Sequence, residues 1–145
     1  MGQSKNYSNF GKKIVEKLRD ENYRNYKKIL DYSKSITVRD YKELPKNPNI
    51  DREIQENIDN NFIFLNSLDS FQTEQLSKLI LKTLDETAFS FLREIEEGLI
   101  DNDSIGLTYK GKKIENIYNE FLSGTFFGEY FLWVEEYSSY GKFQD

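Results

Sequence analysis

The segment Phe71–Gly98 decides the fold of this chain, and it reads FQTEQLSKLILKTLDETAFSFLREIEEG. Its apolar residues recur at steps of three and four, which is the period of an amphipathic α-helix. The main row is Leu76, Ile80, Leu84, Ala88, Phe91 and Ile95, and a second row is Leu79, Leu81, Phe89 and Leu92. Because a helix this broadly apolar needs cover from several neighbours, we expect it at the centre of a helical domain.

The two ends of this central helix also carry signals. Thr73 is expected to cap its first turn, because a threonine hydroxyl can accept from a free backbone N–H there. Gly98 is expected to end it, because glycine readily adopts the left-handed conformation that closes many helices.

Helical periodicity recurs on both sides of the central segment. It predicts helices over residues 8–33, over residues 54–65 with Asn49 or Asp51 as the cap, over residues 114–122, and from Thr125 to Gly141. Residues 34–50 form a connector in which Ile36 and Val38 alternate as in a short strand. Residues 105–114 read as a small β-hairpin turning at Lys110-Gly111. The predicted fold is therefore mainly α: one domain over residues 1–145, with four or five helices around the central one and residues 1–6 disordered.

Composition excludes several kinds of chemistry. The 145 residues contain no cysteine and no histidine, which removes disulfides, thiol catalysis, the commonest metal ligand and the commonest general base near neutral pH. No apolar run is long enough to span a membrane, and the first residues lack a signal-peptide pattern. We therefore expect a cytoplasmic protein with no cofactor.

Charge is unevenly distributed along the chain. Residues 1–50 hold twelve Lys or Arg against six Asp or Glu, a balance of +6, whereas residues 51–145 hold eight against nineteen, a balance of −11. Lys13, Lys17, Arg24 and Lys28 lie along one flank of the first predicted helix. The plain interpretation is a solvated basic face; the alternative is a face that contacts nucleic-acid phosphates.

Acidic residues crowd the second half of the central helix, and they are Asp85, Glu86, Glu94, Glu96 and Glu97. Paired carboxylates can perform acid–base chemistry or hold Mg²⁺, which gives a carboxylate- or metal-dependent enzyme as a third hypothesis. Asp101, Asp103 and Gly106 match the start of a calcium-binding loop, but Ile105 and Lys112 stand where oxygen ligands are needed. The residues therefore favour no metal site.

The last predicted helix contains the only tryptophan, Trp133, between Glu129 and Glu136. Trp133 either covers the edge of the core or anchors a partner, since tryptophan is enriched among binding hot spots. In the second case Glu129, Glu136, Glu94 and Glu97 would supply the acidic rim of a partner-binding face.

Two C-terminal stretches carry a resemblance, DETAFSFLREIEEG over residues 85–98 and FLSGTFFGEYFLWVEEYSSYG over residues 121–141. They resemble parts of small, mostly helical bacterial proteins of unassigned function, some of which are suspected to be immunity proteins of toxin systems. The resemblance implies a non-enzymatic inhibitor, and the acidic balance of residues 51–145 suggests that it would occlude a basic toxin domain. A nucleic-acid-associated or regulatory protein is the alternative.

Overall fold

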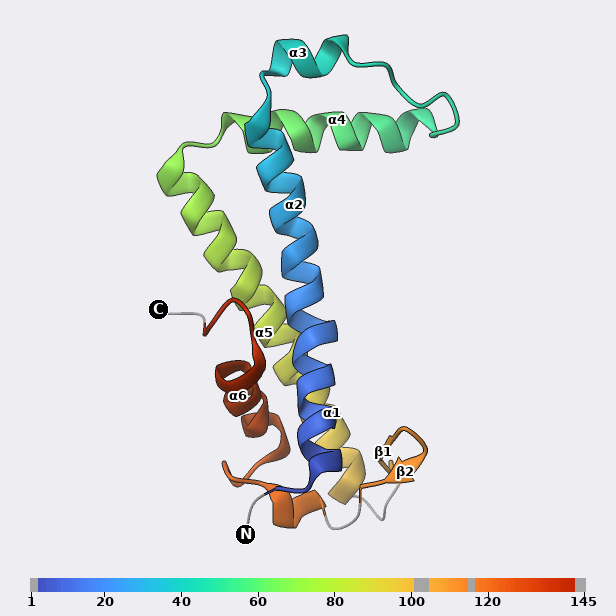
Figure 1. Cartoon of the computed structure of the whole chain (residues 1–145), viewed down its shortest axis with the longest axis vertical. Coiled ribbons are helices and arrows are strands. Elements are labelled where there is room, and N and C mark those ends of the chain that lie inside the picture. The colour runs from blue at the N-terminus through green and yellow to red at the C-terminus, as the bar shows by residue number, and fades with distance from the viewer. Residues whose placement is uncertain (1–2, 101–104, 115–116, 143–145) are drawn as a thin grey trace. The chain divides into compact units, whose positions relative to one another are not determined.

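The computed structural model describes residues 3–100, 105–114 and 117–142. The chain is mainly α-helical with a long central helix, as predicted (Figure 1). In chain order the elements are α1 (Lys5–Val15), a π-helical segment (Glu16–Asp20), α2 (Glu21–Ser35), α3 (Val38–Glu43), α4 (Arg52–Ser67), α5 (Ser70–Ile100), β1 (Thr108–Tyr109), β2 (Lys112–Lys113), a 3₁₀ turn (Ile117–Glu120) and α6 (Phe126–Tyr137).

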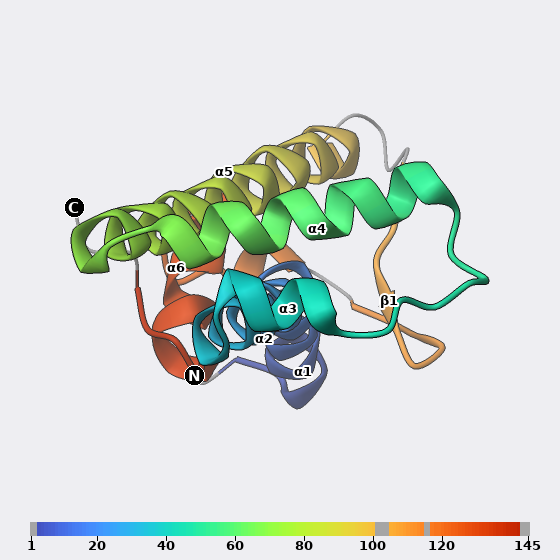
Figure 2. The same cartoon turned by 90° about the horizontal axis from the view of Figure 1, so that it is seen from above.

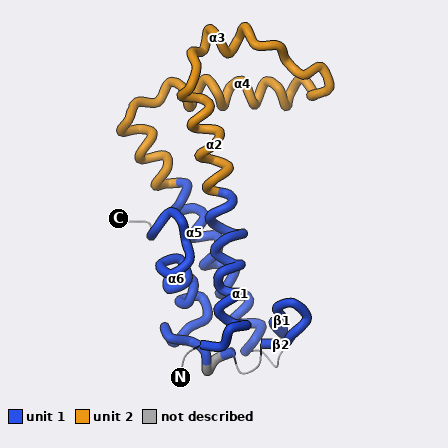
Figure 3. The backbone as a smooth tube through the Cα atoms, in the orientation of Figure 1, with its two compact units in different colours: residues 1–22, 80–145 blue, residues 23–79 orange. Residues whose placement is uncertain are grey.

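The chain divides into two compact units (Figure 3). Unit 1 comprises residues 1–22 and 80–145, and unit 2 comprises residues 23–79. Each unit is described by itself below. The prediction of one domain over residues 1–145 stays a prediction.

Helix α1 begins within the segment predicted to be disordered. The Ser4 hydroxyl caps it by accepting from the backbone N–H of Tyr7, and Gln3 donates to the Glu129 carboxylate at 2.9 Å. Residues 3–6 are therefore tied down by a cap and a side-chain bond that the polar composition alone does not reveal.

The central helix α5 confirms the predicted element but not its ends. Asp69 caps it instead of Thr73: its carboxylate accepts from the N–H of Gln72, whose side chain accepts from the N–H of Asp69, a reciprocal capping box. The helix also continues through Gly98 to Ile100. Gly98 is needed for space, because a Cβ there would lie 2.4 Å from the Ile105 side chain.

The core of unit 1 lies among α1, the unit 1 part of α5, and α6. Its centre is aromatic: the Trp133 ring centroid lies 5.5 Å from that of Tyr7 and 6.0 Å from those of Phe10 and Phe126. Gly11 permits this packing, since a Cβ on it would come within 2.4 Å of the indole. A methyl-sized gap in α1 thus seats the largest side chain of α6.

The buried row of each core helix differs from the predicted one. In α5 the buried residues are Leu81, Asp85, Ala88, Leu92 and Leu99, and Phe91 is 50% exposed. In α6 the periodicity of the sequence predicts a buried row of Phe127, Tyr130, Phe131, Val134 and Tyr137. The buried residues are instead Phe126, Glu129, Tyr130, Trp133 and Val134, and Phe131 is 43% exposed. Each helix is therefore rotated relative to prediction, and each buries one carboxylate.

The smaller elements of unit 1 follow the predicted order. The hairpin is confirmed: β1 pairs antiparallel with β2, and Lys110-Gly111 form its turn. The helix expected over residues 114–122 is a 3₁₀ turn over Ile117–Glu120 in the described part. Thr125 caps α6 as predicted, but α6 ends at Tyr137 rather than at Gly141.

Unit 2 contains α3 and α4, which lie side by side in both views (Figures 1 and 2). The strand expected around Ile36–Val38 is wrong, because Thr37 caps α3 by accepting from the N–H of Asp40. The predicted cap Asp51 starts α4. The Asn66 amide of α4 donates to the carbonyls of Ser33 and Ile36, which closes the end of α2.

A polar cluster joins α3 to α4 within unit 2. Asp59 accepts hydrogen bonds from Lys46, Tyr41 and Gln55. The bond from Lys46, then those from Tyr41 and Gln55, lower the pKa of Asp59 to about 2. Burial, and then the bond to Asp59, raise the pKa of Tyr41 to about 12.

Candidate functional site

The structure places Trp133 and Glu129 in the interior of unit 1. Trp133 is 2% exposed and Glu129 is fully buried. The prediction that these two side chains form part of a partner-binding surface is therefore wrong, and Trp133 takes the alternative role of core packing. The cause is rotation: α6 turns its Phe126–Trp133 row inward and leaves Phe131 and Leu132 outside.

Glu129 organises the interior instead. Its carboxylate accepts from the Tyr7 hydroxyl at 2.9 Å, and from the backbone N–H groups of Leu122 and Ser123 at 3.1 and 2.9 Å. Burial, and then the bond to Glu129, raise the pKa of Tyr7. A buried carboxylate with this many donors holds the start of α1 and the segment before α6 together.

The other three predicted rim residues are exposed. Glu94 and Glu97 project from α5, and Glu97 lies 3.7 Å from Arg93 in an exposed pair. Glu136 lies on α6 beside Tyr137, to which it hydrogen-bonds, and this bond adds to the rise that burial causes in the pKa of Tyr137. These three residues are therefore available to a partner.

A groove between α5 and α6 is the most distinctive surface feature of unit 1. It is a hollow of about 520 Å³ lined by Lys82, Asp85, Glu86, Phe89, Ser90, Phe131, Val134 and Lys142. Phe89 meets Phe127 edge-on at a centroid distance of 4.7 Å and lies 6.1 Å from Phe131. The groove thus has an aromatic floor and a charged edge.

The edge of the groove carries both signs of charge. Lys82 pairs with Glu86 at 3.7 Å, and Lys142 pairs with Glu135 at 2.7 Å. Both pairs are exposed, so each contributes little to stability and can exchange partners at low cost. Glu94 continues the acidic edge along α5, because it lies one turn beyond Ser90.

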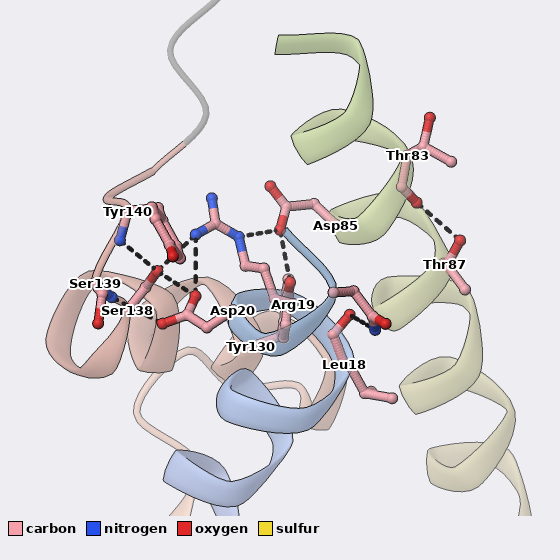
Figure 4. Close-up of polar contacts among 11 residues, drawn as sticks. Leu18, Arg19, Asp20, Thr83, Asp85, Thr87, Tyr130, Ser138, Ser139 and Tyr140 are labelled. Carbon is pink, nitrogen blue, oxygen red and sulfur yellow. Dashed lines mark hydrogen bonds and ion pairs between the residues drawn. The ribbon is translucent and has the colours of Figure 1, made fainter. Parts of the chain in front are cut away.

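A buried ion-pair network shares Asp85 with this groove (Figure 4). Arg19, fully buried, donates through Nε to Asp85 at 2.7 Å and through Nη1 to the Ser138 hydroxyl at 2.6 Å. Tyr130 donates its hydroxyl to the same Asp85 oxygen at 2.6 Å. Burial, and then this bond, raise the pKa of Tyr130. Through Arg19 the network links α5, at Asp85, to the end of α6, at Ser138, and these two helices form the groove.

A second carboxylate closes the network on the C-terminal side. Asp20 accepts from the Ser138 hydroxyl at 2.7 Å and from the backbone N–H of Ser139 at 2.8 Å. The π-helical segment brings Arg19 and Asp20 to the interior together, which a regular helix would do less readily for adjacent residues. The segment after α6 is thereby attached to the N-terminal helix.

The carboxylates proposed for an enzyme do not converge. Asp85 is engaged by Arg19 and Tyr130, Glu96 accepts from the backbone N–H of Phe126, and Glu86 pairs with Lys82. Within residues 3–100, 105–114 and 117–142, no group of three acidic side chains is arranged to hold a metal ion. Asp101 and Asp103 lie outside the described residues.

The basic residues of the first predicted helix are divided between the units. In unit 1, Lys13 pairs with Glu16 at 3.2 Å and Lys17 with Glu21 at 2.5 Å. Arg24 and Lys28 are exposed on α2 in unit 2. Two of the four cations are thus partly neutralised by neighbouring glutamates on their own helix.

Sequence reasoning missed Arg19, Phe89 and Phe131 as site residues. A usable signal existed for Asp85, which falls in one helical row with Leu81, Ala88 and Leu92 and so predicts a carboxylate facing the core. Arg19 continues the row of Tyr7, Gly11 and Val15 in the same way.

Comparisons with known proteins returned no match among family models, curated proteins or solved structures. In the described part of the chain, no helix combines the length and apolar character needed to cross a membrane.

Proposed function

We propose that this chain is a non-catalytic protein-binding protein, of the immunity-inhibitor type, whose α5–α6 groove docks a basic partner. The observation that carries this proposal is the groove itself: half-exposed Phe131 and the Phe89 ring form an apolar centre inside a charged edge. Interfaces commonly have this anatomy, with an aromatic anchor at the centre and a polar rim.

The charge of unit 1 supports a basic partner. Its residues include 11 Lys or Arg and 16 Asp or Glu, a balance of −5, whereas unit 2 has nine of each. The whole excess of negative charge in the chain therefore belongs to the unit that contains the groove. Such a field accelerates association with a cationic surface.

The mechanism is occlusion. A toxin that acts on a polyanionic substrate presents a basic cleft, and an acidic surface with an aromatic anchor can fill that cleft without any chemical step. Phe131 takes the role that the sequence suggested for Trp133, and the exposed Glu94, Glu97 and Glu136 act as rim charges. The narrower class of immunity protein rests on the resemblance of residues 85–98 and 121–141.

The experiment pairs the purified chain with the product of the adjacent gene, which the proposal expects to be a toxin domain with a basic cleft. We expect a stable complex that blocks toxin activity, with association slowed by raised salt because rim charges act through steering. At low salt, Glu97→Lys should associate more slowly than the unchanged protein. The exposed Glu56→Lys in unit 2 is the matched control and should change association less.

Failure to form a complex, or equal effects of Glu97→Lys and Glu56→Lys, would count against the α5–α6 face as the docking surface.

A further inference from the structure

A second hollow in unit 1 has the opposite chemistry to the α5–α6 groove. It has a volume of about 290 Å³ and is lined by Lys5, Asn6, Asn9, Tyr109, Lys110 and Lys112. Each of these side chains offers an N–H or O–H donor, and none is acidic. In a unit with a net charge of −5, this is a local concentration of positive charge.

The fold assembles this hollow from two elements that are distant in sequence. Lys5 and Asn9 are one turn apart on α1 and so share a face. Tyr109 and Lys112 are directly paired across the hairpin, so their side chains lie on one side of it. Asn6 joins the two elements, because its amide donates to the backbone carbonyl of Lys112 at 3.4 Å.

The hairpin turn places the third lysine. Lys110 and Gly111 both have positive φ, 48° and 76°, which is the conformation of a tight two-residue hairpin turn. Glycine suits this geometry, whereas a lysine adopts it at a cost. The Lys110 ammonium lies 5.7 Å from the Tyr109 ring centroid, at the edge of the same hollow.

The three lysines, Lys5, Lys110 and Lys112, have no carboxylate partner in the part of the chain that the structure describes. Lys13 and Lys17, further along the same helical run, do have such partners. The nearby Glu120 is engaged by the backbone N–H of Ser4 at 2.7 Å. Three unpaired ammonium groups around one hollow therefore await a multiply charged anion.

We propose that this hollow, the Lys5–Lys112 site, binds a phosphate-bearing ligand. Lysine serves as a point-charge binder of phosphate, and the Asn6 and Asn9 amides can add neutral donors. The hollow has room for roughly ten water molecules at about 30 Å³ each, which a phosphate group can replace. The ligand's source is either a free polyphosphate or the backbone of a single strand. This site lies on other elements than the α5–α6 groove and does not depend on the proposed function.

Fluorescence anisotropy of a labelled oligothymidylate tests the proposal. With three lysines contacting phosphates of a single strand, affinity should fall roughly 20-fold between 50 and 200 mM salt. The combined variant Lys5→Gln, Lys110→Gln, Lys112→Gln should lose at least tenfold in affinity at 50 mM salt. Lys17→Gln, which removes an exposed lysine of the same unit outside the hollow, should bind as the unchanged protein does.

Competition identifies the source. Displacement of the oligonucleotide by pyrophosphate or ATP indicates a free polyphosphate ligand, whereas resistance to both indicates a strand. Circular dichroism and the melting temperature of the triple variant establish that it folds. No binding at 50 mM salt, unchanged binding by the triple variant, or displacement by polyglutamate as strong as by pyrophosphate would overturn the proposal.

Discussion

Replacing Asp85 by Asn should destabilise unit 1 far more than its small change in volume suggests. The Asp85 carboxylate accepts from Arg19 and Tyr130, and the side chains of Arg19 and Asp85 are 0% and 10% exposed. Removing one member of a buried ion pair leaves the other charge uncompensated, at a cost of about 3–5 kcal/mol. Asp20 lies 3.7 Å from Arg19 and retains part of the compensation. We therefore expect a loss of about 3 kcal/mol.

The adjacent residue provides the control. Glu86 is exposed and pairs with exposed Lys82 at 3.7 Å, so Glu86→Gln should cost less than about 1 kcal/mol. Tyr130→Phe, which removes one hydrogen bond to the same carboxylate, should cost about 1.5–3 kcal/mol. Comparing Asp85→Asn with Glu86→Gln therefore distinguishes the effect of breaking a buried ion pair from the effect of removing a negative charge.

Urea unfolding monitored by tryptophan fluorescence measures these differences. Trp133 is the only tryptophan and lies in the unit 1 core, so its emission reports on the unit that contains the network. The double variant Arg19→Met, Asp85→Leu should recover much of the loss, because removing both charges removes the uncompensated one. If Asp85→Asn is no more destabilising than Glu86→Gln, the buried network is not what holds α1, α5 and α6 together.

Two further predictions concern packing and pH. Gly11→Ala should cost about 1–3 kcal/mol of stability, because its Cβ would lie within 2.4 Å of Trp133. Gly106→Ala, with open space around it, should leave the urea midpoint unchanged. Equal midpoints in the two variants would contradict the close packing of Gly11 on Trp133. The hydrogen bond from Lys46, with two others, lowers the pKa of Asp59 to about 2 from 3.8, so this carboxylate stabilises unit 2 above about pH 4 and that contribution is lost as the pH falls through about 2. Asp59→Asn should therefore flatten the fall in stability measured by circular dichroism between pH 4 and 2, and an unchanged fall would show that Asp59 is not its source.

Three of the helices could be predicted because each has a strong local signal, whereas the sequence favours a strand where the short α3 begins. These three helices show an apolar period with a capping residue close before it. They are the central helix, the helix capped by Asp51 and the helix capped by Thr125. The turn at Lys110-Gly111 is equally local. The corrected helix ends have local causes that composition hides, such as the capping box at Asp69 and the packing of Ile105 on Gly98.

The sequence places Asp85 and Arg19 in line with apolar rows, but it does not reveal the distant partners that make their burial possible. From the sequence, Glu129 is expected on the rim of a partner-binding face and Asp85 among carboxylates that could hold a metal ion, and both are buried. Arg19 is 66 residues from Asp85 in sequence, and Tyr7 is 122 residues from Glu129. These donors offset the cost of burying each carboxylate, so the helix can pack with its carboxylate-bearing face toward the core. The rotation moves Trp133 inward and Phe131 outward, so the candidate site changes with it.

The central claim is tested most directly by the rate at which two variants of this chain dissociate from the toxin domain that the proposal expects as partner. Phe131 and Phe91 are both half-exposed phenylalanines of unit 1, at 43% and 50%, but only Phe131 lines the α5–α6 groove. If Phe131 is the anchor, Phe131→Ala should dissociate at least roughly 30-fold faster, which corresponds to the 2 kcal/mol of a hot spot, while Phe91→Ala should dissociate as the unchanged protein does. Equal rates in the two variants, or a larger effect at Phe91, would contradict binding through this groove.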